Sequence, residues 1–481
     1  MESESRDNSL SRSMGPVGAI ATVIAGTLGA GLFVTIGTAS STTGPSVILA
    51  VALLGVVALA VAINYGWMAT IFPAAGGAYT FVSRSFNSRL LGFVVTWTKW
   101  LGYMAAAAVV ALGFGSYLNV FFPGVPPVLS GFGLLTVLFV INLIGVKGYS
   151  VAQSLLFWLL IATLLLLVIP GMFSIDTASY QPFFTGGLGG FTTAIVPLFF
   201  AFLGIEIAAQ FGAEVRNPGR NLPLAMLGGT GILIVLYMLT AFVIYGVVSD
   251  YTVLSDSTQP LATAASTFLG GYATAVVAVG GLLATSSTVH AVMAAAIKIP
   301  YSWSWDEVFP KQFSRVSERF RTPHWSLLTM YVAASALTFW SSGVNQIIAI
   351  STFSYLIAYL AVSLAAGYLY LKRREANSLA SQAAFQPGAW FYLTIPVAII
   401  GSAGTITQAA NWGALFTGNF GELSTLAIYI PWLAVGLVIF GIYWYRGKQR
   451  DTDVDAILVT IPGVSEEPTE DEPEKTLTGS P

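Results

Sequence analysis

The chain has 481 residues, of which 55% are hydrophobic and 9% are charged, and its formal net charge at pH 7 is −2. Soluble domains carry roughly 25% charged residues, so this composition excludes an ordinary soluble protein and indicates a membrane protein. The absence of cysteine excludes disulfides, thiolate metal sites and thiol catalysis.

Long charge-free stretches fill most of the chain, which predicts an all-α polytopic membrane protein. The stretch between Arg12 and Arg84, for example, contains no charged residue. A membrane-spanning helix needs ~20 apolar residues, and the short alternating strands of a β-barrel are absent from the sequence. We expect about twelve transmembrane helices, at residues 16–42, 46–71, 90–119, 128–145, 150–172, 190–211, 224–248, 270–299, 325–340, 347–371, 391–411 and 424–445.

The distribution of lysine and arginine orients these spans. Basic residues precede the first span and follow spans two, four, six, eight, ten and twelve, whereas the loops on the other side hold none. The positive-inside rule therefore predicts a multi-pass protein of the cell membrane with both termini in the cytoplasm. An odd number of spans would scatter the same charges over both sides.

Two polar tails flank the membrane domain, which we expect at residues 14–446. Residues 1–13 are short and carry acids, unlike the cationic leader of a secretory signal, and predict a cytoplasmic tail. Residues 447–481 are acidic and contain prolines, which predicts a disordered cytoplasmic tail. A plain solvated tail is the simpler interpretation of this segment, and a regulatory role is the alternative.

The first span contains three glycines within six positions, Gly26, Gly29 and Gly31. Glycine is a poor helix former, and hydrocarbon tolerates irregular backbone only where protein or a water-filled cavity surrounds it. This pattern predicts a helix broken at mid-depth, as in the binding site of a secondary transporter. The alternative is a packing face whose glycines let a neighbouring helix approach closely.

The third span contains Lys99, whereas the other basic residues lie at or beyond the ends of spans. Two interpretations of this buried position are open. The ammonium group snorkels towards the cytoplasm along the flexible side chain, or it is an internal cation near a binding site.

The sixth span repeats the features of the first. Gly204 and Glu206 lie near its middle, where a carboxylate is costly and typically functional. Two breaks five spans apart predict an inverted-topology repeat, because an odd number of spans turns the second copy over. The repeats are expected at 16–172 and 190–371, with two further helices at 391–445.

Several segments resemble the motifs of one transporter family. They are GTLGAGLF at 26–33, PAAGGAY at 73–79, FAFLGIE at 200–206 with EVRNP at 214–218, and DEVFP at 306–310 with Thr322-Pro323. In these segments the chain is similar to the amino acid–polyamine–organocation (APC) transporters. The resemblance implies a LeuT-type 5+5 inverted repeat plus two helices, a permease rather than an enzyme, and amino acids as the commonest substrates.

In this family pattern, the backbone around the two breaks binds the amino acid. The N–H groups of Gly29, Ala30 and Gly31 would face the substrate carboxylate, and carbonyls of both spans would accept from its ammonium. Ala30 stands where many relatives carry Ser or Thr, and Trp67 stands where members often have Glu. The resemblance implies a substrate-binding set of Thr27, Gly29, Ala30, Gly31, Phe200, Ala201, Phe202 and Leu203.

The acids available to a substrate are few. Glu206 is the only strong acidic candidate in the pocket region, since spans three, eight and ten offer no carboxylate for a cationic side chain. Together with the phenylalanines of the sixth span, this predicts neutral, apolar amino acids as substrates. Glu206 itself has two open roles, as a proton-coupling group or as a hydrogen-bonding residue that holds the unwound segment.

The resemblance also implies a coupling-ion site between spans one and eight. Carbonyls of Ala25 and Leu28 and hydroxyls of Ser286 and Ser287 would supply its oxygens, which suits a hard cation. Some proton-coupled relatives place a lysine of helix five there, and residues 155–167 contain none, which favours sodium. The alternative is that these hydroxyls bond back to carbonyls of their own helix.

His290 lies one turn beyond Ser286 on the same helical face. Because an imidazole titrates near neutral pH, His290 is a candidate proton carrier. Glu206 and Lys99, as ionisable side chains inside spans, are further candidates. A packing role for this histidine is the alternative.

The predicted function is secondary active amino acid transport by alternating access, with sodium favoured as the coupling ion. Proton coupling, exchange and polyamine substrates are the alternatives within this class, and a transporter-like nutrient receptor is the alternative outside it. No repeating selectivity ring supports a channel, and too few catalytic residue types are present to support an enzyme. No cofactor is expected beyond sodium or a proton, and the expected partners are an amino acid and membrane lipid, without nucleic acid.

Overall fold

The computed structural model describes residues 12–144, 149–255, 257, 259–317, 322–340, 343–375, 378–384, 386–410 and 425–449. Only 12–13 and 447–449 of the two predicted tails are included, so the predictions for the tails lie outside the described residues. Within the ranges above, the chain forms helices and no β-strand, which confirms the all-α prediction.

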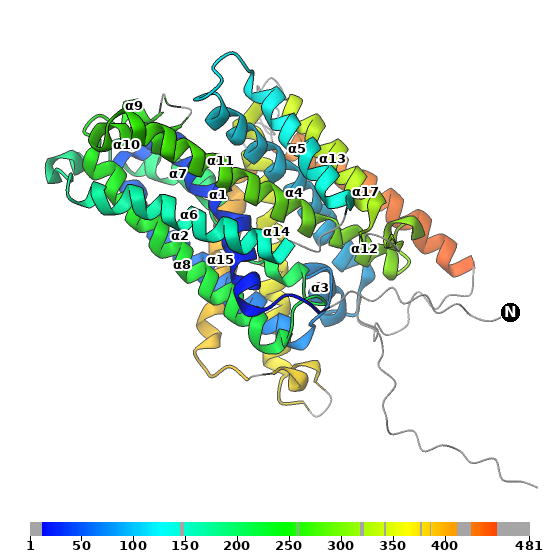
Figure 1. The fold of residues 1–481 in the computed structure, drawn as a ribbon. Coiled ribbons are helices and arrows are strands. Elements are labelled where there is room, and N and C mark those ends of the chain that lie inside the picture. Colours follow the sequence, from blue (N-terminus) through cyan, green and yellow to red (C-terminus); the bar gives the residue numbers. More distant parts are fainter. Residues whose placement is uncertain are drawn as a thin grey trace, which may run out of the picture.

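Helices follow one another along the whole of the described chain (Figure 1). The longer ones are α1 (Pro16–Thr43), α2 (Val47–Ile71), α4 (Arg89–Leu118), α5 (Pro127–Ile144), α6 (Tyr149–Met172), α7 (Gly187–Phe200), α8 (Pro218–Val247), α11 (Gly271–Ala296), α13 (His324–Phe339), α14 (Val344–Lys372), α15 (Phe391–Ala409) and α17 (Thr425–Gln449). The shorter ones are α3 (Ala78–Ser85), α9 (Thr252–Ser255), α10 (Pro260–Leu269) and α12 (Lys298–Trp305), with 3-10 turns η1 (Gly44–Ser46), η2 (Thr177–Tyr180), η3 (Ile207–Gln210), η4 (Lys311–Ser314) and η6 (Leu379–Gln382).

Each of the twelve predicted spans coincides with a helix. Nine helical segments of the described chain are long and apolar enough to cross a membrane. The other three predicted spans correspond to the shorter helices α5, α7 and α13, with 18, 14 and 16 residues. The polytopic all-helical class is therefore confirmed.

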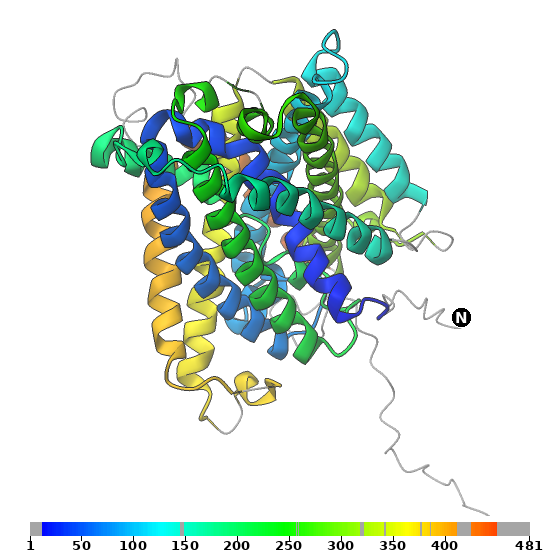
Figure 2. The ribbon, with the colours of Figure 1, turned by 60° about the vertical axis from the view of Figure 1, so that its left-hand side comes forward.

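The central helix of the bundle is α1, which packs against α7, α8 and α11 (Figure 2, dark blue). Further contacts join α2 to α7 and α8, and α4 to α14 and α11, while α6 lies against α11. In an inverted repeat, each of the first five spans has a counterpart five spans later, so α1 corresponds to α7, α2 to α8, α4 to α11 and α6 to α14. Under this correspondence the α1–α8 contact matches the α2–α7 contact, and the α4–α14 contact matches the α6–α11 contact. These pairs agree with the inverted repeat, which stays a prediction.

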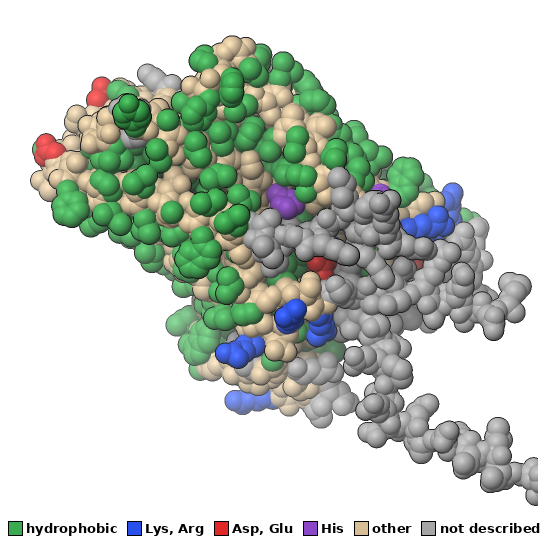
Figure 3. Space-filling view, viewed as in Figure 1, with side chains coloured by type: hydrophobic (Ala, Val, Ile, Leu, Met, Phe, Trp, Pro, Cys, Tyr) green, Lys and Arg blue, Asp and Glu red, His purple; other side chains and the backbone are tan. Residues whose placement is uncertain are grey.

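Apolar side chains cover much of the outside of the bundle, and small residues take part in the packing of its inside. Figure 3 shows hydrophobic side chains spread over the visible face, and exposed examples include Trp158, Leu393 and Ile400. Inside, α4 is lined by buried alanines at 105–108. Lipid tails are as apolar as leucine, so close packing, which small residues allow, helps to hold such helices together.

The predicted break in the first span is wrong, because α1 is one continuous helix from Pro16 to Thr43. The reason is close packing: a Cβ atom on Gly29 would lie 2.3 Å from the carbonyl oxygen of Ala284 in α11. A Cβ atom on Gly31 would lie 2.4 Å from the hydroxyl of Tyr237 in α8. The glycines of α1 thus form the packing face that was the alternative interpretation.

The predicted break in the sixth span is confirmed. Helix α7 ends at Phe200, residues 201–206 form turns, and the chain resumes as η3 at Ile207. Gly204 has a φ of +103°, a conformation that side-chain-bearing residues rarely adopt. A Cβ atom at this position would also lie 2.7 Å from the carbonyl oxygen of Gly26. Glycine is therefore needed at the break for both its backbone conformation and its lack of a side chain.

Candidate functional site

The unwound segment 201–206 lies against the middle of α1. The hydroxyl of Tyr237 in α8 lies 2.9 Å from the carbonyl oxygen of Ala201 and 3.2 Å from that of Thr27, and it donates between them. Two predicted substrate-binding residues from distant parts of the chain are thus brought together. Sequence reasoning missed Tyr237, because nothing in span seven marks which of its side chains faces span one.

The other predicted substrate-binding residues are placed around this point. Gly29 and Gly31 lie on the faces of α1 that contact α11 and α8, and Phe200, Phe202 and Leu203 are buried. The ring of Phe202 meets that of Tyr237 edge-on, with centroids 5.3 Å apart. The hydroxyl of Thr27 donates to Val23 of its own helix at 2.8 Å. The side chain of Ala30 lies outside the described part.

A hydroxyl from α11 is inserted into the hydrogen-bond ladder of α1. Thr288 donates to the carbonyl of Ala25, and its hydroxyl accepts from the N–H of Gly29 at 3.1 Å. Ala25 and Gly29 are the two residues that would otherwise bond to each other across one helical turn. Such an insertion loosens the ladder locally without ending the helix.

The predicted hydroxyls of the coupling-ion site need a correction. The hydroxyl that meets Ala25 belongs to Thr288, not to Ser286 or Ser287. Ser287 instead donates to the side-chain oxygen of Gln153 in α6 at 2.7 Å, while Ser286 is half-buried. Successive helical residues differ by about 100° in direction, so an error of one position turns the side chain to another neighbour. Leu28 is fully buried on α1.

Lys99 forms a buried ion pair with Glu206. Its Nζ lies 2.7 Å from Oε1 of Glu206, and both side chains have 0% exposure. The snorkelling interpretation of Lys99 is therefore wrong, because Lys99 is an internal cation; that it lies near a binding site stays a prediction. The pair joins α4 to the unwound segment.

Tyrosine side chains surround this ion pair. The ammonium of Lys99 lies 5.4, 5.3 and 5.7 Å from the ring centroids of Tyr65, Tyr103 and Tyr355. The hydroxyl of Tyr103 donates to Oε1 of Glu206 at 3.3 Å, and that of Tyr359 donates to Oε2.

We call Glu206 and the four tyrosines, which together surround the ammonium group of Lys99, the ammonium cage. Its tyrosines come from α2, α4 and α14. The four-residue spacings Lys99–Tyr103 and Tyr355–Tyr359, which place side chains on one helical face, are the sequence signal that could have found them.

His290 is buried in α11, two residues after the inserted Thr288. Its proton-carrying role stays a prediction.

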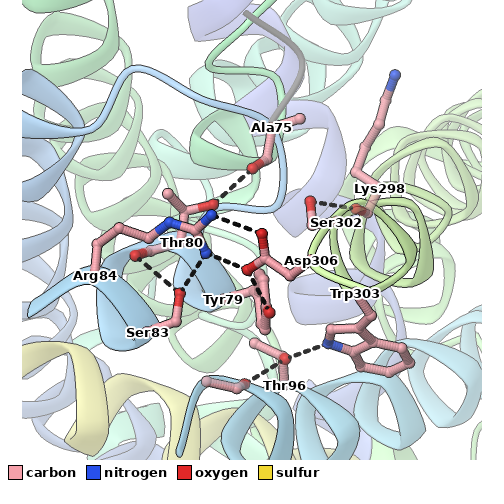
Figure 4. A network of polar contacts seen from close by, with 11 residues as sticks. Ala75, Tyr79, Thr80, Ser83, Arg84, Thr96, Lys298, Ser302, Trp303 and Asp306 are labelled. Atoms are coloured by element: carbon pink, nitrogen blue, oxygen red, sulfur yellow. Dashed lines mark hydrogen bonds and ion pairs between the residues drawn. The ribbon is translucent and has the colours of Figure 1, made fainter. Parts of the chain in front are cut away.

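A second polar network ties α3 to α12 at one end of the molecule (Figure 4). The guanidinium of Arg84 forms an ion pair with Asp306 through two nitrogens, and Nη2 donates to Oδ1 at 2.8 Å. The hydroxyl of Tyr79 donates to the same carboxylate at 2.6 Å. Burial, followed by the charge of Asp306, raises the pKa of Tyr79 well above its ordinary value, so the phenol stays a donor.

Two further contacts close the same end. Lys298 of α12 forms an ion pair with Glu214, which follows η3. The chain before α1 pairs with this segment, since Met14 donates to the carbonyl of Glu214 at 3.0 Å and accepts from the N–H of Arg216 at 2.9 Å. Elements from both halves of the chain are thus held together here.

Comparisons with known proteins agree with this architecture. A family model described as amino acid permease matches residues 14–440. The chain is 26% identical to a methylthioribose transporter of Bacillus subtilis, covering 92% of this chain and 95% of that protein. It is 22% identical to the branched-chain amino acid permease BcaP of Bacillus subtilis, covering 91% and 94%. It is 27% identical to the vacuolar cationic amino acid transporter 4 of Arabidopsis thaliana, covering 74% and 62%.

The family match covers most of the chain, and the helices within it form a multi-pass membrane bundle. An interrupted span and a buried ion pair lie at the centre of that bundle, as expected for a transporter. The chain therefore belongs to the amino acid permease family of the APC superfamily, a family of transporters and not of enzymes.

Proposed function

We propose that the protein carries neutral, apolar amino acids across the cell membrane by alternating access, coupled to sodium. The observation that carries the proposal is the interruption of the sixth span at 201–206. It places irregular backbone in the interior of a membrane bundle, held in part by Tyr237 and Tyr359, and a zwitterionic amino acid can bind such backbone in exchange for these contacts. The chain's membership of the amino acid permease family supports the substrate class.

The preference for neutral side chains is supported by the state of Glu206. The carboxylate is paired with Lys99 and accepts from two tyrosines, so it has no unpaired charge to offer a cationic side chain. Phe200, Phe202 and Leu203 add apolar surface beside the segment.

Sodium coupling is supported by the oxygen atoms between α1 and α11. The carbonyls of Ala25 and Leu28 and the hydroxyl of Thr288 would hold the ion, and an all-oxygen donor set fits a hard cation. The bound cation would supply positive charge that favours one packing of α1 against α11. Proton coupling through Glu206, His290 or Lys99 and uncoupled exchange are the competing outcomes.

The orientation with both termini in the cytoplasm is supported by the basic residues. In Figure 3 the visible lysines and arginines gather towards the lower and right-hand end of the molecule. This is the end at which Arg84–Asp306 and Lys298–Glu214 join α3, α12 and the segment after η3. Opening towards the cytoplasm would have to separate these contacts.

The test is initial uptake into proteoliposomes that contain the full chain. A panel of neutral, cationic and acidic amino acids, putrescine and methylthioribose is offered under an imposed sodium gradient at fixed pH. The measurements are repeated with a proton gradient in sodium-free buffer. Saturable, sodium-driven uptake of neutral amino acids is expected. Uptake of methylthioribose alone would refute the substrate class, and uptake that follows only the proton gradient would refute sodium coupling.

A further inference from the structure

We propose that Lys99 is a specificity-determining residue whose ammonium group fills the ammonium cage and thereby excludes substrates with a positively charged side chain. The inference rests on the proposed amino acid transport and names the residue that restricts its substrate range. It follows from the identity, position and charge of the groups around Lys99.

The cage has the chemistry of an ammonium-binding site. A carboxylate lies 2.7 Å from the nitrogen, and the rings of Tyr65, Tyr103 and Tyr355 lie 5.3 to 5.7 Å from it. Aromatic faces at this distance attract a cation, most strongly when water is excluded. Here the ammonium belongs to α4 itself, so the site is filled by a tethered group of the chain.

The cage is built onto the unwound segment. Tyr359 accepts from the N–H of Gly204 at 3.2 Å and donates to the carboxylate of Glu206. One wall of the cage is therefore the same irregular backbone that is proposed to bind the amino acid. A substrate side chain that enters from this segment meets Lys99 and Glu206 together.

Charge balance then decides which side chains fit. A neutral side chain leaves the Lys99–Glu206 pair intact, whereas a second ammonium would share one carboxylate with Lys99. In a buried site such like-charge crowding is strongly unfavourable and acts against the wrong ligand. If Lys99 is removed, Glu206 keeps its tyrosine donors and is left without a cation, which a cationic substrate can provide.

The competing interpretation is that the pair only holds the fold. Removing either partner would then reduce transport of all substrates equally. A specificity role predicts instead that removal of Lys99, but not removal of Glu206, favours the uptake of cationic substrates, which makes the two interpretations separable.

The experiment compares initial uptake of L-lysine and L-leucine by wild type and by Lys99→Met. We expect the ratio of L-lysine to L-leucine uptake to rise by about tenfold or more in Lys99→Met. Glu206→Gln should show no such rise, and Lys99→Met combined with Glu206→Gln should lack the gain. Lys99→Arg keeps the charge and should still reject L-lysine. The matched control is Lys311→Met, which replaces an exposed lysine of η4 and should leave both rates unchanged.

If Lys99→Met transports too poorly for uptake to be compared, ligand binding can be measured instead by thermal unfolding. In purified Lys99→Met, L-lysine should raise the thermal unfolding midpoint more than L-leucine does, and the order should be reversed in wild type. An unchanged uptake ratio and unchanged ligand order in Lys99→Met would overturn the inference, as would an equal gain in the double variant. If wild type moves no amino acid, the proposed function fails, and the thermal shifts still decide whether the cage selects by charge.

Discussion

Spans one and six both carry glycines at mid-membrane depth, yet they fold differently. Helix α1 continues through Gly26, Gly29 and Gly31, whereas the sixth span stops at Phe200 and resumes at Ile207. The glycines of α1 have helical backbone conformations, and Gly204 has a positive φ. Glycine therefore lets neighbouring helices approach α1 closely in one span, and it allows an unusual backbone conformation in the other.

The two spans also differ in the groups that form hydrogen bonds with their backbone N–H and C=O groups. In α1 the hydroxyl of Thr288 bridges Ala25 and Gly29, so a loosened turn remains helical. In the sixth span, Tyr359 accepts from Gly204 and Tyr237 donates to Ala201. Local turns and side chains from other helices together replace the missing ladder there, which is how irregular backbone is tolerated in a membrane. The following substitutions test this contrast.

The largest effect is expected for Gly204→Ala. The positive φ and the approach of Gly26 both oppose a side chain, and a strained backbone alone costs about 1–3 kcal/mol. We expect loss of uptake and a clearly lower thermal unfolding midpoint. Wild-type uptake by this variant would show that the break does not depend on the glycine conformation.

Gly29→Ala should come next. Its Cβ atom would meet backbone of α11, which cannot move as a single side chain can, and overpacking of this kind costs about 1–3 kcal/mol. Uptake should fall sharply while the protein still inserts. The control is Gly228→Ala in α8, where nothing lies within 4 Å of the added atom and no loss is expected. Equal behaviour of the two variants would contradict a packing role for Gly29.

Thr288→Val tests the inserted hydroxyl with little change in shape. The direct bond between Ala25 and Gly29 can then form, so folding should survive, but the oxygen proposed to hold sodium is lost. We expect stimulation of uptake by sodium to fall by about fivefold or more. Ser286→Ala is the comparison variant and should keep the stimulation. A larger effect of Ser286→Ala would restore the original assignment of the site.

The smallest effect is expected for Tyr237→Phe. It removes one hydroxyl that donates between Thr27 and Ala201 and keeps the ring against Phe202. Loss of a buried hydrogen bond costs about 0.5–1.5 kcal/mol, with a further cost for unsatisfied carbonyls. We expect a modest drop in the unfolding midpoint and a raised KM. An unchanged midpoint and KM would show that this contact does not hold spans one and six together.

The sequence by itself determined the class of protein, the places of the twelve helices and the break in the sixth span. These features depend on the length of apolar runs, on the scarcity of charge and on the coincidence of Gly204 with the buried Glu206. Each is local, because a chain in hydrocarbon must satisfy its own backbone or interrupt it where protein surrounds it.

The tertiary structure alone decided whether the glycines of α1 break or pack, since Ala284 and Thr288 come from a helix far along the chain. It also decided that Lys99 turns inward, because Glu206 lies on the unwound segment, and Tyr65 and Tyr355 lie on α2 and α14. Hydropathy and spacing report that a residue is inside a span, but not its direction around the helix axis. Successive residues differ by about 100° in direction, so Thr288 contacts α1 whereas Ser287 contacts α6. Only the packing of the helices decides how α11 as a whole is turned about its axis.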